Sequence, residues 1–574
     1  MSPAAAIVLC LMPELSYQTV ASWGQGSMDQ ATVPWYTRLS AEQREQWLDG
    51  LYTTRDGGLG LNLCRCYLCA GDAPGHHHMD RHPGGRLDPL GYSAGPGQWL
   101  WDGHQVSLWA AQGAAQRGAQ LLGFANSPPA WMTVSGCTSG SKDGASNNLA
   151  RQHEADYVAY LVELARHYRD AWGVDFDYLD PINEPEADWW KANGGQDGCH
   201  VDAEQAARLF AQLAPALKAA GLKAKVIGPE AAYGNTVGYL DQLLKHPDAV
   251  AGLAVFCTHQ YITDDGSQRA WARRGRVAGK PVWMSEWGDW KTGGWTQAAN
   301  YAAKIAQAWR YLRCESWAMW EPALLADLQH GQVVRRKAFC ATAQYTRYAR
   351  PGTRLIEAAD GSGQSLAFLD EAAHKVSIML FNPAAEERRV RLDAQQLAGF
   401  KLLDAVRTSA AESLASVPPP VDPADVSLPP RSITTLTASY ESLRPGLVRN
   451  PGFETGRPDG WTVEGEAGVE DSYPAGGYYD GFLHPHAAPA ALRQQVRGLT
   501  PGRRYLLSAS CAASGVEARL TAPGGSATVS GGGYRGYQVG FSAAGDGGAR
   551  IAFEAPRADA KAWAVIDNVA VTPL

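Results

Sequence analysis

The sequence predicts an α/β protein in which a (β/α)8 barrel is followed by an antiparallel β-sandwich and a jelly-roll domain. From about residue 17 to 350, short apolar runs alternate with longer amphipathic ones, as in repeated βα units. From 352 to 440 the runs become short and alternating, and beyond 447 glycine-rich turns separate strand-like segments. A chain of 574 residues is also too long for one domain. The predicted domains are 17–350, 351–440 and 447–574.

Eight short apolar runs are the predicted strands of the barrel. Helical segments with apolar residues at three- and four-residue spacing lie between them, for example 152–169, 203–220 and 297–312. A barrel of this kind carries its active site at the carboxyl ends of the strands. The predicted strands are 17–24, 58–69, 119–125, 176–182, 225–229, 253–259, 281–285 and 316–320.

Two all-β domains are predicted after the barrel. In the first, the runs 364–369, 375–381 and 432–437 alternate as strands do, and the proline-rich segment 417–423 is expected to be an extended loop. The second begins near residue 447 and closes with the run 563–569. Its length of about 130 residues suits a jelly roll.

Composition limits the classes of partner. A formal charge of −7 gives no electrostatic reason to bind nucleic acid or anionic membranes. Twenty tryptophans and twenty-three tyrosines suit the apolar faces of sugars, although they also serve as ordinary core. No apolar run reaches the roughly 20 residues of a membrane span. We therefore expect a monomer that acts on a neutral polysaccharide or oligosaccharide.

The ten cysteines are mostly scattered and do not indicate a disulfide-dense scaffold. Cys64, Cys66 and Cys69 lie inside a predicted strand, where alternate side chains face opposite sides, so zinc binding is disfavoured. Residues 4–12 are apolar but lack a basic leader and a clear cleavage site. They are interpreted as a truncated signal remnant, and a secreted or periplasmic location is expected from the function proposed below.

Two glutamates end predicted barrel strands beside tryptophans. Glu184 follows the fourth strand in Asn-Glu-Pro, with Trp189 and Trp190 close behind, and Glu286 ends the seventh strand in Ser-Glu-Trp. Glycosidic hydrolysis needs a proton donor for the leaving oxygen and a nucleophile or base at the anomeric carbon. The alternative is that each glutamate is a rim carboxylate or a helix cap, but both occupy the expected positions in an eight-strand count.

The two glutamates receive different roles. We assign Glu184 as the acid/base, because burial beside Trp189 and Trp190 would favour its protonated form. Glu286 is the candidate nucleophile, kept ionised by hydrogen bonds or by a cation such as Arg65. A retaining enzyme would hold the two carboxyls about 5–5.5 Å apart, and an inverting one roughly 6.5–9.5 Å apart.

The segment Phe124-Ala-Asn-Ser-Pro-Pro-Ala-Trp-Met-Thr-Val-Ser-Gly136 resembles the signature after the third strand of glycoside hydrolase family 30. With the motifs around Glu184 and Glu286, the resemblance covers roughly residues 17–440. It implies a retaining enzyme of clan A with an attached β-sandwich, in which these residues are acid/base and nucleophile.

The resemblance also implies contacts with the substrate. Asn183 would contact the 2-hydroxyl group of the sugar at the cleavage site, and Arg65 would hold the nucleophile ionised. Each residue has barrel packing as its alternative role. The full set of candidate substrate-binding residues is Arg65, Asn126, Trp131, Asn183, His259, Tyr261, Trp287 and Trp320.

The sequence of this segment is most similar to that of the endo-β-1,6-galactanase branch of the family. The similarity implies β-1,6-linked galactan as substrate. Xylanases, β-1,6-glucanases and exo-acting β-glycosidases share the barrel and remain alternatives, as does a non-catalytic polysaccharide-binding protein of another class. Two segments depart from the family pattern: 22–27 in the first strand, and the loop 75–84. Four histidines between 76 and 82 either hold a metal, contact the substrate or are simply exposed to solvent. No cofactor is required for the hydrolysis.

The ends of the last domain resemble those of carbohydrate-binding jelly rolls, in Asn450-Pro-Gly-Phe-Glu454 and in Ile566-Asp-Asn-Val569. The resemblance implies Glu454 and Asp567 as candidate ligands of a structural calcium ion. Aromatic residues are candidates for a sugar-stacking platform, although a spacer with partly buried rings is the alternative. They are Tyr473, Tyr478, Tyr479 and Phe482.

Overall fold

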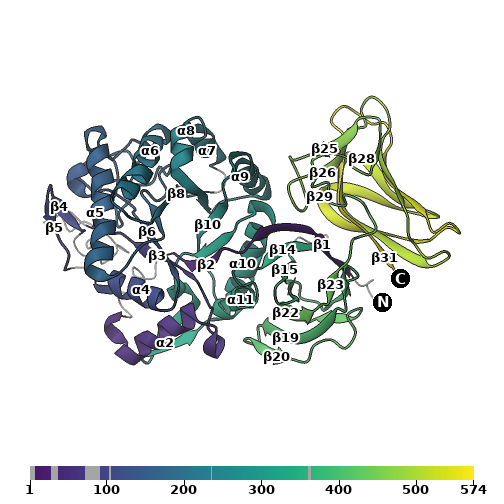
Figure 1. Ribbon diagram of the computed structural model, residues 1–574, viewed down its shortest axis with the longest axis horizontal. Coiled ribbons are helices and arrows are strands. Elements are labelled where there is room, and N and C mark those ends of the chain that lie inside the picture. Colours follow the sequence, from purple (N-terminus) through teal and green to yellow (C-terminus); the bar gives the residue numbers. More distant parts are fainter. Residues whose placement is uncertain (1–6, 27–35, 72–90, 103–104, 234–235, 360–363) are drawn as a thin grey trace. The chain divides into compact units, whose positions relative to one another are not determined.

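A computed structural model describes residues 7–26, 36–71, 91–102, 105–233, 236–359 and 364–574 (Figure 1). The chain divides into two compact units. One consists of residues 21–301 and 314–347 and holds the barrel, and the other holds the remaining segments, including both all-β domains. The fold class predicted from the sequence is confirmed.

Eight parallel strands close the barrel in the order β10-β11-β2-β3-β6-β7-β8-β9. Each corresponds to a predicted strand, and the first is shorter than expected because only Ser22–Gln25 belongs to the barrel. The strands are β2 (Ser22–Gln25), β3 (Leu63–Tyr67), β6 (Gln120–Phe124), β7 (Tyr178–Asp180), β8 (Lys225–Ala231), β9 (Leu253–His259), β10 (Val282–Trp287) and β11 (Ser316–Met319).

Helices cover the outside of the barrel (Figure 1). Side-chain caps fix several starts: Ser40 and Gln43 form a capping box on α2, and Asp202 accepts from the third residue of α6. The predicted helix 297–312 ends as an α-helix at Gln307 and finishes in a π-helical turn. The helices are α2 (Ala41–Tyr52), α4 (Gln105–Gln116), α5 (Glu154–Trp172), α6 (Ala203–Ala219), α7 (Val237–Leu243), α8 (Pro247–Gly252), α9 (Asp265–Ala278), α10 (Gly294–Gln307) and α11 (Lys337–Thr346).

The interior of the barrel is apolar towards the amino ends of its strands and polar towards their carboxyl ends. Leu63, Leu122, Ile227, Val255 and Trp283 belong to one buried cluster. Farther along the strands charged side chains enter the lumen: on β3 Arg65 lies two positions after Leu63, whereas on β10 Glu286 lies three after Trp283, because the pairing with β9 shifts between Met284 and Glu286. On β3 the step from the apolar layer at residue 63 to the charged layer takes two positions, which places the chemistry at the carboxyl ends of the strands.

The first all-β domain is built on a nine-stranded sheet with the order β20-β19-β22-β16-β15-β14-β1-β17-β21. Its strand β1 (Ile7–Thr19) pairs antiparallel with β14 (Arg354–Ala359) and parallel with β17 (Arg388–Asp393). The interpretation of residues 4–12 as a signal remnant was therefore wrong for residues 7–12, and residues 17–19 are not in the barrel. The other strands are β15 (Leu366–Asp370), β16 (Lys375–Asn382), β19 (Lys401–Ser409), β20 (Ala415–Val417), β21 (Val426–Leu428) and β22 (Ser432–Ser439).

The second all-β domain has an eight-stranded sheet in which β28 lies between β30 and β31 and also pairs with β29. Two strands are unusually long, β28 with 19 residues and β29 with 18, and register shifts accompany the pairing of β28 with β29 and with β31. Phe453, Leu492 and Phe553 are central in its core. The strands are β24 (Thr462–Glu464), β25 (Ala467–Glu470), β26 (Asp480–Leu483), β27 (Ala490–Val496), β28 (Arg504–Ala522), β29 (Gly525–Ser542), β30 (Ala549–Ala555) and β31 (Trp563–Pro573).

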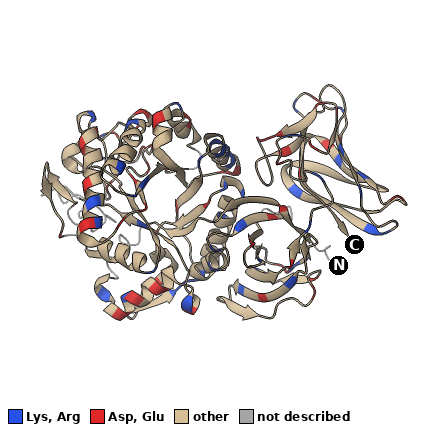
Figure 2. Cartoon of the chain, viewed as in Figure 1, with Lys and Arg blue, Asp and Glu red and all other residues tan. Residues whose placement is uncertain are grey.

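The distribution of charge agrees with the composition. Basic and acidic residues are interspersed along the helices of the barrel in this view, as on α5 (Figure 2). None of the helices in the described part of the chain combines the length and apolar character of a membrane span. All ten cysteines are buried.

Candidate active site

Glu184 and Glu286 lie at the carboxyl ends of two barrel strands. Glu184 follows β7 and Glu286 belongs to β10, and both are buried. The backbone of Glu184 has a φ of 50°, in the left-handed region that residues other than glycine seldom adopt. Its N–H donates to the carbonyl oxygen of Glu230, 3.0 Å away. The surrounding structure therefore holds the backbone of Glu184 in an unfavourable conformation, and this conformation sets the direction of the side chain.

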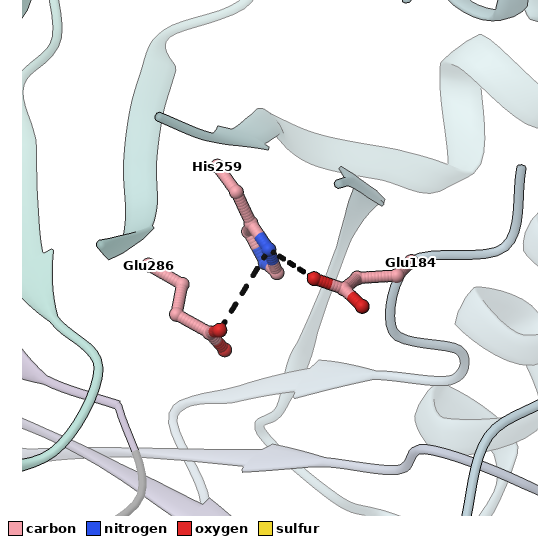
Figure 3. A group of neighbouring side chains, drawn as sticks. All are labelled: Glu184, His259 and Glu286. Carbon is pink, nitrogen blue, oxygen red and sulfur yellow. Dashed lines mark hydrogen bonds and ion pairs between the residues drawn. The ribbon is translucent and has the colours of Figure 1, made fainter. Parts of the chain in front are cut away.

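The two carboxylates face each other beside an imidazole. One oxygen of Glu184, one oxygen of Glu286 and a ring nitrogen of His259 all lie within 4.8 Å of one another (Figure 3). This closest approach of the oxygens fits the separation of about 5–5.5 Å between carboxyl groups in retaining glycosidases better than the wider spacing of inverting ones. Three such groups could also ligate a metal ion, but two carboxylates are sufficient for hydrolysis.

Glu286 accepts hydrogen bonds from two neighbours. Nη1 of Arg65 lies 2.5 Å from its Oε2, and the hydroxyl group of Tyr261 donates to its Oε1 over 2.8 Å. The guanidinium of Arg65 also lies over the ring of Phe124, 3.7 Å from the centroid. A buried carboxylate with a cation and a hydroxyl donor is stabilised in its ionised form, which is the form a nucleophile needs.

His259 connects the acid/base candidate with a third carboxylate. Its Nδ1 lies 3.0 Å from Oε1 of Glu184 and 3.8 Å from Oε1 of Glu286, while Nε2 lies 2.9 Å from Oε2 of Glu230. The imidazole is 1% exposed, so water does not compete for these contacts. With both ring nitrogens facing carboxylates, the doubly protonated ring can donate on both sides.

The sequence analysis missed Glu230. It lies near the end of β8 and is fully buried, with a φ of 52°. Its Oε2 accepts from His259, from Nη2 of Arg65 at 3.4 Å and from Oγ of Ser285 at 2.5 Å. In Gly-Pro-Glu230 a glutamate directly follows the fifth predicted strand, as Glu184 and Glu286 follow the fourth and the seventh. Its position at the end of a strand could therefore have indicated Glu230.

At three groups of this cluster, burial and the neighbouring charges shift the pKa in opposite directions, and the charges together have the larger effect. Burial alone would raise the pKa of Glu230, but Arg65 and His259 lower it to about 2. Burial alone would lower the pKa of His259, but the facing carboxylates, Glu286 foremost, raise it to about 10. Burial likewise opposes the charge of Arg65, yet Glu230 and Glu286 raise its pKa. Arg65, His259 and Glu230 therefore carry charge at neutral pH.

Glu184 is the group in this cluster that favours a proton. Burial raises its pKa, and the charge of Glu286 adds to the increase, although His259 opposes it through a hydrogen bond and its charge. The fully buried Asp180 beneath it has a pKa well above its usual value, through burial and the charge of Glu230. The surroundings of Glu184 therefore favour its protonated form, which is the form that a general acid needs.

The two asparagine candidates have different hydrogen-bond partners. Asn183 accepts from Nη2 of Arg65 through Oδ1, 2.5 Å away, so it belongs to the cluster. Asn126 is also buried, and its amide donates to Asp197 over 3.3 Å. Asp197 in turn accepts from the backbone N–H of Ala70, 3.1 Å away. Asn126 thus contacts a neighbouring polar group, and its predicted role in substrate binding stays a prediction.

The tryptophan candidates divide between the mouth and the wall of the barrel. Trp320 is half-buried and packs edge-on against Trp290, which packs in the same way against Tyr261. Trp287 is buried against Tyr301 of α10, because alternate residues of a strand face opposite sides and its neighbour Glu286 faces inward. Trp131 is half-buried and donates from Nε1 to Ser93.

Glu454 and Asp567 belong to the second all-β domain. Glu454 accepts from the backbone N–H groups of Tyr478 and Tyr479, and Asp567 accepts from those of Gly476 and Asn568. Backbone N–H donors already occupy these oxygens, which is a poor match to the convergent oxygen ligands that calcium prefers. Calcium binding there stays a prediction. The histidine loop 76–82 lies outside the described residues.

A parallel (β/α)8 barrel with two facing carboxylates at the carboxyl ends of its strands defines a glycoside hydrolase. The model of O-glycosyl hydrolase family 30 matches residues 11–267 of this chain.

Known proteins with related sequences and folds agree. An endo-β-1,6-galactanase of Hypocrea rufa is 24% identical over 384 residues, covering 62% of this chain and 77% of that protein. An endo-1,6-β-D-glucanase of Trichoderma harzianum is 25% identical over 392 residues, with 62% and 75% covered. The catalytic domain of a family 30 xylanase from Talaromyces cellulolyticus superposes with a TM-score of 0.60 at 20% identity, over 75% of this chain and all of that domain.

Proposed function

We propose that this protein is a retaining glycoside hydrolase that cleaves β-1,6-linked galactan by double displacement. One observation carries the mechanism: an oxygen of Glu184 and an oxygen of Glu286 lie within 4.8 Å of each other. That spacing leaves too little room for the water that an inverting enzyme activates between its carboxylates.

In the first step, the ionised carboxylate of Glu286 attacks the anomeric carbon while Glu184 gives its proton to the departing glycosidic oxygen. The bond to that oxygen breaks, and an ester bond forms between the sugar and Glu286. In the second step, Glu184 takes a proton from water, whose oxygen attacks the anomeric carbon and releases Glu286. Arg65 and Tyr261 hold the nucleophile in both steps through their contacts of 2.5 and 2.8 Å.

The choice of β-1,6-galactan rests on similarity to the Hypocrea rufa enzyme. The second candidate is β-1,6-glucan, which the similarity to the Trichoderma harzianum enzyme supports. Product analysis on de-arabinosylated arabinogalactan, β-1,6-glucan and xylan separates them. We expect β-1,6-galacto-oligosaccharides from the wild type and none from Glu286→Gln. Gluco- or xylo-oligomers instead would discard the galactan proposal, and no product from any polymer would favour an exo-enzyme or a binding protein.

The second all-β domain is proposed to bind the same polysaccharide. Tyr473 and Tyr534 stack with centroids 5.5 Å apart, and Trp563 meets Tyr473 edge-on. All three rings are half-buried, so each keeps a part of its face available to an apolar sugar surface. Retention on insoluble galactan that is lost in Trp563→Ala, while catalysis on soluble substrate is kept, is the expected result. Export from the cell stays a prediction, as does the monomeric state.

A further inference from the structure

Two tryptophans in loops at the barrel mouth have exposed side chains. Among the described residues, the tryptophans that are more than a third exposed are Trp189, at 37%, and Trp290, at 53%. Trp189 follows Glu184 in the loop after β7, and Trp290 follows Glu286 in the loop after β10 and packs against Tyr261.

Trp189 lies in a loop that is tightly packed around its neighbour Trp190. The neighbouring Trp190 is buried, and its Nε1 donates to the carbonyl oxygen of Glu184 over 3.0 Å. A β-carbon at Gly198 would come within 2.2 Å of the ring of Trp190, so the loop closes tightly over that indole. Trp189 lies 5.8 Å from Trp190, centroid to centroid. The acid/base and the exposed indole therefore share one ordered segment.

Tyr233 completes the aromatic surface from the next loop. It follows β8 and is half-buried, and its ring centroid lies 5.1 Å from that of Trp189 at an interplanar angle of 52°. The two rings form a corner of which the more exposed wall is the indole. Sugar rings present flat C–H faces that pack on such amphipathic rings, and hydroxyl groups at their edges can meet the phenol oxygen.

We propose that Trp189 and Tyr233 form the subsite for the leaving part of the substrate and stack a neutral pyranose ring there. The inference rests on the proposed function, because the acid/base donates its proton to the leaving oxygen and therefore lies on the departing side. The nucleophile, with Tyr261 and Trp290, lies on the side of the sugar that is retained. Binding on both sides of the bond suits cleavage inside a chain.

The subsite has a second consequence for the ester intermediate. A sugar that binds at Trp189 after the first step places a hydroxyl group where the leaving oxygen had been. Glu184 then removes the proton of that hydroxyl, its oxygen attacks the anomeric carbon, and the bond to Glu286 breaks. The product is a longer oligosaccharide, formed in competition with hydrolysis by water.

The test compares two substrates that share the retained part. One is a β-1,6-galacto-oligosaccharide, which fills the leaving-group subsite, and the other is the β-fluoride of β-1,6-galactobiose, which leaves it empty. In Trp189→Ala we expect kcat/KM on the oligosaccharide to fall about 10- to 100-fold, as for loss of a stacked aromatic contact, with little change on the fluoride. The fraction of transfer to an added galactoside should fall as well.

Further variants serve as controls for this experiment. Trp189→Phe should retain most of the activity, and Val277→Ala, which shortens an exposed apolar side chain on α9, should have no effect. If Trp189→Ala does not fold, Tyr233→Ala carries the same comparison. Equal losses on both substrates, or no loss on either, would overturn the subsite. A wild type that is inactive on the fluoride and on every polymer would instead refute the proposed function.

Discussion

The imidazole of His259 lies 2.9 Å from the carboxylate of Glu230, a residue 29 positions earlier on the neighbouring strand of the barrel. Through this contact the acid/base candidate, which lies 3.0 Å from the other ring nitrogen, is connected to a carboxylate that has no direct part in the chemistry. Glu230 also contacts Arg65, the cation beside the nucleophile. Both halves of the catalytic pair therefore depend on one buried anion.

Replacing Glu230 by Gln should destabilise the protein at neutral pH by about 3 kcal/mol, because two buried cations lose a shared partner. Its folded pKa of about 2 lies below the unfolded value, so its contribution is present above the unfolded pKa and is lost as the pH falls through the folded one. Denaturant unfolding should show a difference between wild type and variant that is large at pH 7 and shrinks towards pH 2. Equal stabilities at pH 7 would contradict this.

His259→Asn should move the alkaline limb of the pH profile of kcat/KM to higher pH. Activity requires protonated Glu184 and is lost as the pH rises through its pKa. Burial raises that pKa, and the charged imidazole opposes the increase, so an uncharged side chain that keeps a donor lets it rise further. The measurement is the profile on an oligosaccharide. A limb that stays in place, or moves to lower pH, would show that the imidazolium does not act on Glu184.

Glu184→Gln should lower kcat/KM on an oligosaccharide by about 100-fold or more, within the usual range for general acid catalysis. A dinitrophenyl glycoside, whose leaving group needs no proton, should be cleaved at a far less reduced glycosylation rate. The matched control is Glu186→Gln, two residues later, where Oε1 accepts from the N–H of Ala232 and an amide oxygen can replace it. Equal losses on both substrates would argue against general acid catalysis by Glu184.

Tyr261→Phe should reduce kcat about 10-fold with a small effect on stability, because one hydrogen bond to the charged nucleophile is lost while the ring remains. Single-turnover kinetics should assign the loss to formation or breakdown of the ester. An unchanged kcat would show that Arg65 alone is sufficient to hold Glu286.

Much of the barrel could be predicted from the sequence, because its strands are short apolar runs that end in polar residues. Residues 7–12 could not be placed, since an apolar run at a chain end has the same composition whether it is a leader or a buried strand. Its neighbours β14 and β17 come more than 340 positions later. That pairing is a property of the tertiary fold.

The candidate site was predicted in part. Glu184 and Glu286 were proposed because each ends a predicted strand close to tryptophans. Glu230 also ends a predicted strand but has no tryptophan close by in sequence, and its contact with His259 depends on β9 lying beside β8. Trp287 was proposed as a substrate contact from its position next to Glu286, yet it packs against Tyr301. The two-residue period of a strand already indicated that these neighbours face opposite sides.

The most direct test of the central claim is to trap the covalent intermediate. The wild type would be incubated with an activated 2-deoxy-2-fluoro-β-galactoside, digested and mapped by mass spectrometry. The account predicts one fluorosugar attached to the peptide that contains Glu286, with protection by substrate and no label in Glu286→Gln. A label on any other residue, or inversion of the anomeric centre in the product without any covalent adduct, would contradict it.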